Sequence, residues 1–222
     1  MTERDPPPSA PAAGTDGTRA QAHTLEAVAA SIVLLSAIVF ALQVTAVTPL
    51  SGSTSNQHIE TQQAEMAEGL LSGEAENGSL RRAVLYYNAS GNRFHDAAGA
   101  RGEYEGRVPT GPDPPRFVLG TALSETFLER GIAVNVNLYH LDGGDRRRQP
   151  LIELGTPSDH AATATRQVTL FDDDELRDDH GDPTGETLGS VATDSDREYF
   201  AGNEFDSPVY NVVEVEVVVW RT

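Results

Sequence analysis

The strongest pattern along the chain is a long apolar run near the N-terminus. From Ala27 to Thr48, 22 consecutive residues carry no charge and are mostly Ala, Val, Ile and Leu. A helix of this length spans about 33 Å, which matches the hydrocarbon core of a bilayer. We therefore predict a transmembrane helix over residues 21–48.

Two competing interpretations fit this run less well. A cleaved secretory signal has an apolar region of about 7–15 residues followed by a small-residue cleavage site, whereas this run is longer and has no such exit before Thr48. A buried helix of a soluble protein usually keeps a polar face. Arg19 precedes the run and the next basic residue is Arg81, so we expect a single-pass cell-membrane protein with a cytoplasmic N-terminus and an extracellular C-terminal part.

The segments on either side of the run differ in character. Residues 1–20 are rich in Pro, Gly, Thr, Ala and charged residues without periodicity, which predicts a disordered leader. Residues 49–73 regain helical spacing, for example at Ile59 and Met66, so we predict a stem helix with a break near Pro49. Its apolar stripe either packs on the chain's own head domain or forms a surface shared with neighbouring subunits.

Residues 74–222 have the mixed pattern of an α+β head domain. Leu80–Asn88 is compatible with a helix or with a strand, and we favour a helix that Ser79 caps. The Gly- and Pro-rich segment Asp96–Pro115 predicts an exposed loop.

A second helix and three strands complete the predicted head. Leu119, Leu123 and Phe127 recur every four residues and predict a helix that stops at Arg130–Gly131. Apolar and polar residues alternate in three later segments, which predicts half-buried strands: Ile132–Leu141, Ala164–Phe171 and Tyr210–Trp220. The expected fold is a hydrophobic transmembrane and stem helix followed by a mainly antiparallel sheet with one or two short helices.

The charge balance indicates a salt-rich environment. All 16 basic residues are arginine, and 34 acidic residues bring the formal net charge to -18. Such a surface repels nucleic acid phosphates, so we expect no nucleic acid partner. Cysteine is absent, which excludes disulfides and thiolate metal sites.

The acidic run Phe171–Asp182 supplies clustered oxygens of the kind that calcium prefers. Its spacing departs from the EF-hand, because a loop starting at Asp172 places Leu176 at position five and Arg177 at position six. We interpret the run as a solvated loop between strands. The six histidines are scattered singly, so we predict no metal site and no cofactor.

Catalytic motifs are missing as well. No G-x-S-x-G occurs, and the stretch GTDGTRA lacks the lysine and the preceding strand of a phosphate-binding loop. Arg146–Arg148 follows Gly143 and Gly144 and predicts a hairpin turn rather than a binding site. We therefore predict no catalytic residues and no enzymatic activity.

The start of the apolar run carries the one specific motif. Gln21-Ala22-His23-Thr24-Leu25-Glu26 followed by an apolar helix resembles the class III signal of archaeal type IV pilins. Residues 19–90 and the segments RGIAVNVNLYH and GTPSDHAATATRQVTLFDDD are similar to pilin-like membrane proteins of halophilic archaea, many of them uncharacterised. In that family a prepilin peptidase cuts before the apolar helix, which places the cut between Ala20 and Gln21. Glu26 is then the sixth mature residue, where the family has glutamate near the fifth.

The resemblance also implies roles and partners. Glu26 would pair with the freed N-terminal amine as pilin-like subunits assemble through their N-terminal helices, and a membrane-anchored minor pilin or pseudopilin that enters a surface filament would be the function. An unprocessed, membrane-anchored extracellular binding or adhesion protein is the alternative, in which Glu26 is hydrated among the lipid headgroups. Asn77 and Asn88 begin N-x-S sequons, which fit glycosylation of an exported domain.

Overall fold

The computed structural model describes the backbone of residues 16–110, 117–205 and 207–221, and the side chains in these ranges other than those of 16–22 and 43–56. Of the predicted leader, residues 1–15 lie outside the described residues, whereas Asp16 already begins a helix. The chain divides into two compact units between Ser55 and Asn56, and each is described by itself.

Helix α1 runs from Asp16 to Glu76. The predicted helix over residues 49–73 is present, but the predicted break near Pro49 is wrong, because the helical assignment continues through this residue. A proline removes one backbone donor and crowds the carbonyl four residues before it, which weakens a helix locally without requiring it to end. The division between the two units nevertheless falls shortly after Pro49.

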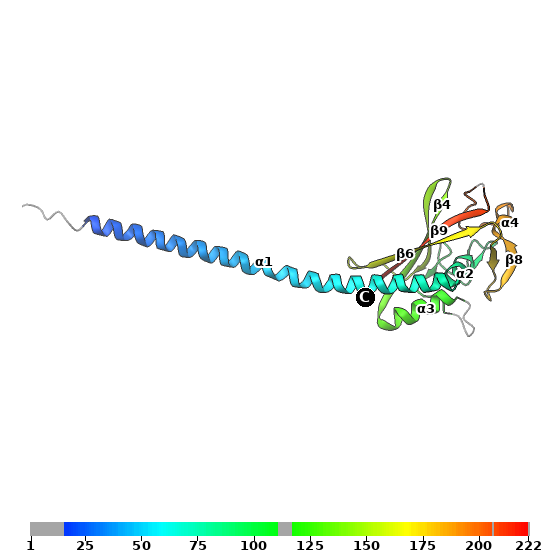
Figure 1. The fold of residues 1–222 in the computed structure, drawn as a ribbon, viewed down its shortest axis with the longest axis horizontal. Coiled ribbons are helices and arrows are strands. Elements are labelled where there is room, and N and C mark those ends of the chain that lie inside the picture. The colour runs from blue at the N-terminus through cyan, green and yellow to red at the C-terminus, as the bar shows by residue number, and fades with distance from the viewer. Residues whose placement is uncertain (1–15, 111–116, 206, 222) are drawn as a thin grey trace, which may run out of the picture. The chain divides into compact units, whose positions relative to one another are not determined.

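The second unit combines the end of α1 with the sheet and the short helices (Figure 1). Its further elements are, in chain order, α2 Ser79–Leu85, β1 Tyr87–Asn88, β2 Arg93–Phe94, β3 Tyr104–Glu105, α3 Val118–Thr126, a 3₁₀ turn Leu128–Arg130, β4 Ile132–Asp142, β5 Asp145–Glu153, β6 Ala162–Phe171, β7 Glu175–Arg177, β8 Pro183–Thr187, α4 Leu188–Ala192 and β9 Val209–Arg221.

The main sheet has the strand order β3-β5-β4-β9-β6. All its pairs are antiparallel except β3 with β5. Strand β9 lies between β4 and β6, so its alternating valines pair on both sides; Val217, for example, lies opposite Val136 on β4 and Ala164 on β6. The three strands predicted from alternation are confirmed, and the described part of the chain has the predicted α+β character.

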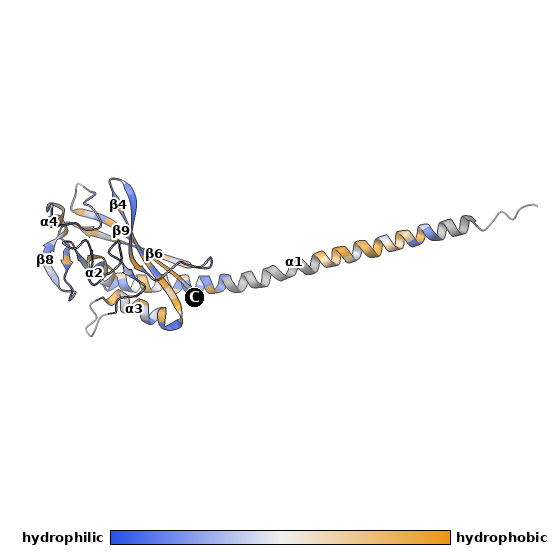
Figure 2. Cartoon of the chain, turned by 180° about the vertical axis from the view of Figure 1, so that it is seen from behind, coloured by the Kyte–Doolittle hydropathy of each residue, from blue (hydrophilic) through white to orange (hydrophobic). Residues whose placement is uncertain are grey.

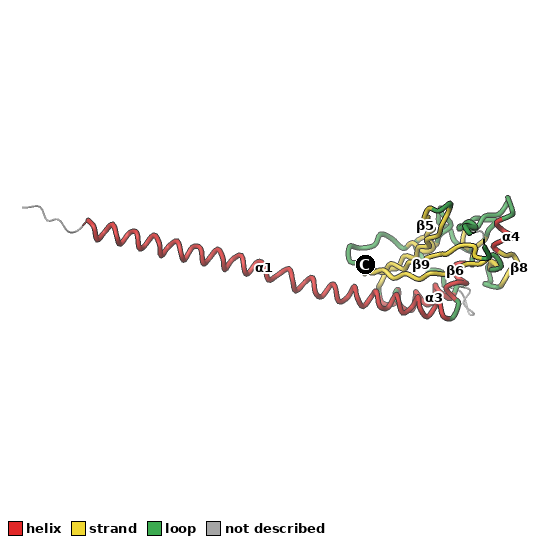
Figure 3. The backbone as a smooth tube through the Cα atoms, turned by 45° about the horizontal axis from the view of Figure 1, so that its top comes forward, coloured by secondary structure: helices red, strands yellow, loops and turns green. Residues whose placement is uncertain are grey.

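One face of the sheet is covered by helices. The end of α1 beyond Asn56, α2 and α3 lie on the same side of the strands (Figures 1 and 3), and their apolar residues belong to one core with the inward side chains of the sheet. Leu71, Leu80 and Leu123 are fully buried with Val134 and Val215. At ~25 cal/mol per Å² of apolar area, this shared core is the main stabilising contribution to the second unit.

The predicted helix at Leu80–Asn88 is confirmed as α2, although its last residues leave the helix and Tyr87–Asn88 form β1. Ser79 is not its cap: Gly78 occupies that position with φ 76°, a left-handed conformation that glycine adopts without a Cβ clash. Asn77 Oδ1 accepts the hydrogen bond of the Ser79 amide at 2.8 Å. The predicted helix ending at Gly131 is confirmed as α3 and its 3₁₀ extension, with Gly131 at φ 70°.

Two other predictions are wrong. The segment Asp96–Pro115 is not simply an exposed loop, because β3 lies within it and Tyr104 is fully buried; residues 111–116 lie outside the described chain. The hairpin predicted here is present between β4 and β5, but Gly143 and Gly144 alone form its turn with positive φ, and Arg146–Arg148 already lie in strand β5. Polar residues dominate the start of β5, so the sequence there lacks the alternation that marks a strand.

Candidate functional site

Within α1, the segment His23–Leu42 is long and apolar enough to cross a membrane. All its large apolar side chains are exposed, from 47% at Ile38 to 72% at Leu25. Figure 2 shows this segment in orange over successive turns. Exposed apolar area of this extent marks a surface that contacts lipid or another protein. The side chains of residues 43–48, the end of the predicted span, lie outside the description.

Glu26 is the single carboxylate of this segment. Its side chain is 82% exposed, and Oε2 lies 3.7 Å from His23 Nδ1, one helical turn earlier. The helix face that continues from Glu26 is lined by small and branched side chains, including Ala30, Ala37 and Ala41. This surface therefore combines one acidic group with a face that a second helix can approach closely.

Ala20 and Gln21, the predicted processing site, lie in helical backbone because α1 begins at Asp16. Their side chains are among those that the structure does not describe. The structure therefore gives the backbone conformation at the predicted cut and no contact that would identify it as a cut.

The two sequons occupy different environments. In the first, the Ser79 side chain is buried, and its hydroxyl has three acceptors for its one proton: the Glu74 carboxylate, Asn77 Oδ1 at 2.5 Å and the Glu74 carbonyl at 3.2 Å. In the second, Asn88 and Ser90 are both exposed, and Asn88 Oδ1 accepts the Gly91 amide at 2.9 Å in a turn. Asn88 is therefore the sequon asparagine with an accessible partner serine in the folded chain.

The acidic run folds as a hairpin, with β7 and β8 on either side of the turn 178–182. Asp178, Asp179 and His180 bring one ligand atom each within 4.8 Å of one another, a proximity that the scattered histidines of the sequence did not predict. Asp178 Oδ1 accepts the amides of Asp182 and His180, and these hydrogen bonds, that of Asp182 first, lower the pKa of Asp178. The aspartate therefore has a structural role in closing the turn.

The arginines of β5 are paired within the sheet. Arg146 forms an ion pair with Glu214, and its guanidinium lies 3.7 Å from the centre of the Tyr139 ring. Arg148 Nε donates to Asn137 Oδ1 at 2.9 Å. Because these partners occupy the guanidinium groups, this stretch is part of the sheet surface rather than an open basic patch.

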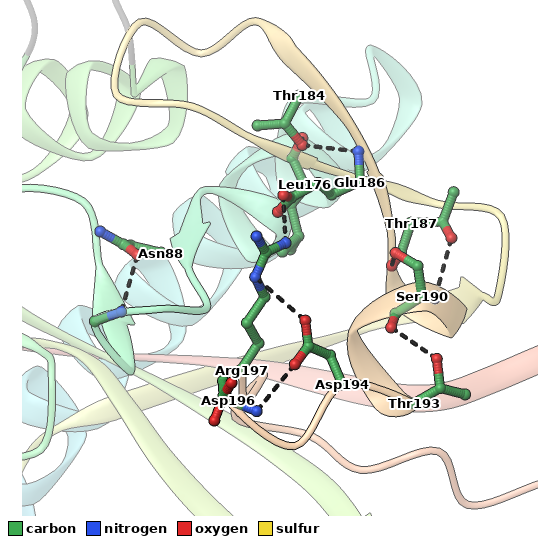
Figure 4. A network of polar contacts seen from close by, with 11 residues as sticks. Asn88, Leu176, Thr184, Glu186, Thr187, Ser190, Thr193, Asp194, Asp196 and Arg197 are labelled. Carbon is green, nitrogen blue, oxygen red and sulfur yellow. Dashed lines mark hydrogen bonds and ion pairs between the residues drawn. The ribbon is translucent and has the colours of Figure 1, made fainter.

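A second polar network surrounds Arg197 (Figure 4). Arg197 Nε lies 3.5 Å from Asp194 Oδ2, and Nη1 pairs with Glu186. Thr187 caps helix α4 by accepting the Ser190 amide at 3.2 Å. These contacts fix α4 and the turn after it, which accounts for the network without a ligand.

Comparisons with known proteins identify a family but no function. Neither the curated proteins nor the solved structures gave a match. Residues 19–219 match the model of a family of unknown function, DUF7288. The match begins just before the apolar segment of α1 and ends within β9, so it includes residues 19–55 of the first unit and nearly all of the second. The chain therefore belongs to the DUF7288 family.

Proposed function

We propose that this chain is a pilin-like subunit, of the minor pilin or pseudopilin type, which α1 anchors in the cell membrane with the head outside the cell. The observation that carries the proposal is the exposed apolar segment His23–Leu42 with the single carboxylate Glu26 near its start. A helix of 20 residues spans about 30 Å, the thickness of a hydrocarbon core.

The position of Glu26 suggests how such a subunit would assemble. An ionised carboxylate costs about 2.5–3.5 kcal/mol at the centre of a bilayer and less near its edge, so it persists in an apolar environment when it has a partner. His23, 3.7 Å away, is one partner within the helix. The N-terminal amine of a processed neighbouring subunit is a stronger one, because it carries a full charge and can be buried together with the carboxylate.

The helix face next to Glu26 supports close contact between subunits. Ala30, Ala37 and Ala41 line it, and small residues let helix backbones approach each other in lipid, where apolar burial alone gives little driving force. Assembly would then place an apolar helix beside a copy of itself, with the charge of Glu26 neutralised at one end.

A second candidate function is a permanently anchored extracellular binding protein whose leader is never cut. The observation that favours it is the start of α1 at Asp16, which places the bond between Ala20 and Gln21 in helical backbone. Peptidases act on locally unfolded chain, so this helix would have to open before cleavage.

The N-terminus of the native full-length protein distinguishes the two functions. We expect intact mass and N-terminal sequencing of the membrane-extracted protein to show a chain that begins at Gln21 or Ala22. A cut after Gln21 would make Glu26 the fifth mature residue. A chain that still begins at Met1 or Thr2 would overturn the pilin-like function in favour of the anchored binding protein.

Substitution of Glu26 tests the assembly step. We expect Glu26→Gln to leave cleavage intact and to abolish cross-linked oligomers in native membranes, because the neutral amide does not pair with an amine. Glu68→Gln is the matched control, since Glu68 is an exposed glutamate of α1 outside the apolar segment. Oligomers of Glu26→Gln equal to those of the control would contradict the assembly role.

A further inference from the structure

Strand β6 forms one edge of the main sheet, because β9 is its single partner among the described strands. Its first seven residues, 162–168, make no hydrogen bond to any described residue apart from those of the β6–β9 ladder. Beyond them, Arg81 Nη2 donates to the Thr169 carbonyl at 2.6 Å, and the pairing with β9 shifts register between Leu170 and Phe171. Residues 162–168 are therefore a stretch of open edge, with backbone groups that the described chain leaves unpaired.

The side chains of this open edge alternate between the core of the second unit and an exposed face. The exposed side chains of the alternation are neutral and polar: Thr163, Thr165 and Gln167. Arg166 is the one charged residue of β6, and the strand contains no acidic residue in a chain that has 34. A contact through β6 therefore brings no carboxylate of this strand against a second acidic chain.

The opposite side of the sheet is protected in ways that β6 lacks. Strand β3 covers only two residues of β5, Ile152 and Glu153. The rest of β5 carries Arg146–Arg148 and Pro150, and natural sheet edges use charged side chains and proline to prevent pairing with another strand. Strand β6 has no proline and a single charge over ten residues, so its open edge is suited to accept a further strand.

We propose that the β6 edges of two copies of this chain pair antiparallel, which makes the two sheets continuous. Residues opposite each other in such a pair share a face, so the two-fold axis passes through one residue rather than between two. Thr165 is the centre of the open edge and lies opposite Thr165 of the second copy, with Arg166 opposite Ala164. An axis through Arg166 would instead oppose two like charges, which is destabilising.

A second copy is the occupant that the composition of this edge favours. Each copy offers the same neutral edge, and threonines opposite each other stabilise a strand pair. Copies that His23–Leu42 holds in one membrane meet at a raised effective concentration, so a short pairing suffices. The contact lies in the second unit and does not depend on processing of the N-terminus. It closes at two copies, which distinguishes it from larger oligomers built through the apolar helix.

Single thiols test the pairing in the full-length protein, because the chain has no cysteine of its own. Native membranes are treated with a short bis-maleimide. Thr165→Cys should give a dimer, because the two Cβ atoms would lie about 5 Å apart. Thr169→Cys is the matched control: it is exposed on the same face of β6, but the proposed register separates its two copies by about 26 Å along the strands. About tenfold more dimer is expected at position 165, since only there are the two thiols within reach of the reagent.

Three outcomes would overturn the proposal: no cross-linked product at position 165, equal dimer yields at the two positions, or a product that joins position 165 to a different protein. The two thiol variants should have the same denaturant midpoint, since both positions are exposed. Adding Glu26→Gln to Thr165→Cys separates this contact from assembly of the apolar helix. We expect the dimer to persist, and its loss would assign the contact to α1 instead of β6.

Discussion

Glu60 Oε1 and His160 Nδ1 lie 2.7 Å apart and join α1 to the connection between β5 and β6, although 100 residues separate them in the chain. This contact closes one side of a cavity that Gln63 also lines. It also tethers a connection in which residues 155–159 are exposed.

The strength of this tether can be measured by removing the imidazole. His160→Gln should lower the free energy of unfolding of the full chain by no more than about 1 kcal/mol, because the two side chains are 65% and 34% exposed and solvent screens the pair. Chemical denaturation with His58→Gln as a control measures the effect, since His58 is an exposed histidine of the same helix. A loss of several kcal/mol would show that the connection is held mainly through this pair.

The centre of the sheet should be far more sensitive. Leu138 on β4 is fully buried opposite Val215, so Leu138→Ala should destabilise the second unit by about 2–5 kcal/mol through lost burial and an unfilled cavity. Thr165→Ala on β6 is an exposed control and should stay within about 0.5 kcal/mol of the parent. Denaturant midpoints of the two variants check this difference; equal midpoints would contradict the assigned core.

Burial of His140 predicts a pH dependence of stability. Desolvation lowers the pKa of His140 below its usual value, and the Phe200 ring centre lies 5.5 Å from the imidazole. The Leu141 carbonyl oxygen, 3.1 Å from Nδ1, raises this pKa and so offsets part of the effect of burial. The unfolded chain therefore binds the proton more readily, and this histidine reduces stability as pH falls below about 6.5, its unfolded pKa, toward the lowered folded value. Asp142, which favours the charged form, and Arg147, which opposes it, act more weakly.

The corresponding experiment compares the parent with His140→Gln between about pH 7.5 and about pH 5.5. As the pH is lowered over this range, the free energy of unfolding of the parent should decrease more steeply than that of the variant. Parallel curves of unfolding free energy against pH would mean that His140 is protonated equally easily in the folded and the unfolded state. His58→Gln again serves as the control, and its curve should follow that of the parent.

The sequons give a prediction about modification. If the folded head meets a glycosylation machinery, Asn88 should carry glycan and Asn77 should not, because Ser90 is exposed whereas Ser79 is buried and hydrogen-bonded. Peptide mass mapping of the native protein tests this, with Asn88→Gln expected to remove the added mass and Asn77→Gln to leave it. Glycan at Asn77 alone would show that modification precedes folding of α2.

Periodicity was sufficient for the long elements that have one side facing the core. The alternation in Tyr210–Trp220 and in Ile132–Leu141 predicted β9 and β4, and the four-residue spacing of Leu119, Leu123 and Phe127 predicted α3. It failed where polar residues form a strand, as at Arg146–Arg148 in β5. There the partners are Tyr139 and Glu214 from other strands, which no local pattern contains.

The candidate residues also divide into those that the sequence predicted and those that it did not. Glu26, Ala20 and Gln21 were singled out by a short motif beside an apolar run, and their proposed roles still rest on that motif together with the exposure of the helix. Gln63 had no signal in the sequence, because it was one polar residue among several on a predicted stem. Its burial is a product of the tertiary structure, in which Arg221, 158 residues further on, lines the same cavity.

The sequence by itself determined the apolar segment, the acidic composition and the central strands, because these depend on the nature and spacing of neighbouring residues. The tertiary structure alone decided that Tyr104 is buried beside β5, that Ser79 is inaccessible while Ser90 is not, and that Gln63, His160 and Arg221 line one cavity. These outcomes depend on contacts between residues distant in the chain, which strand order and helix packing bring together.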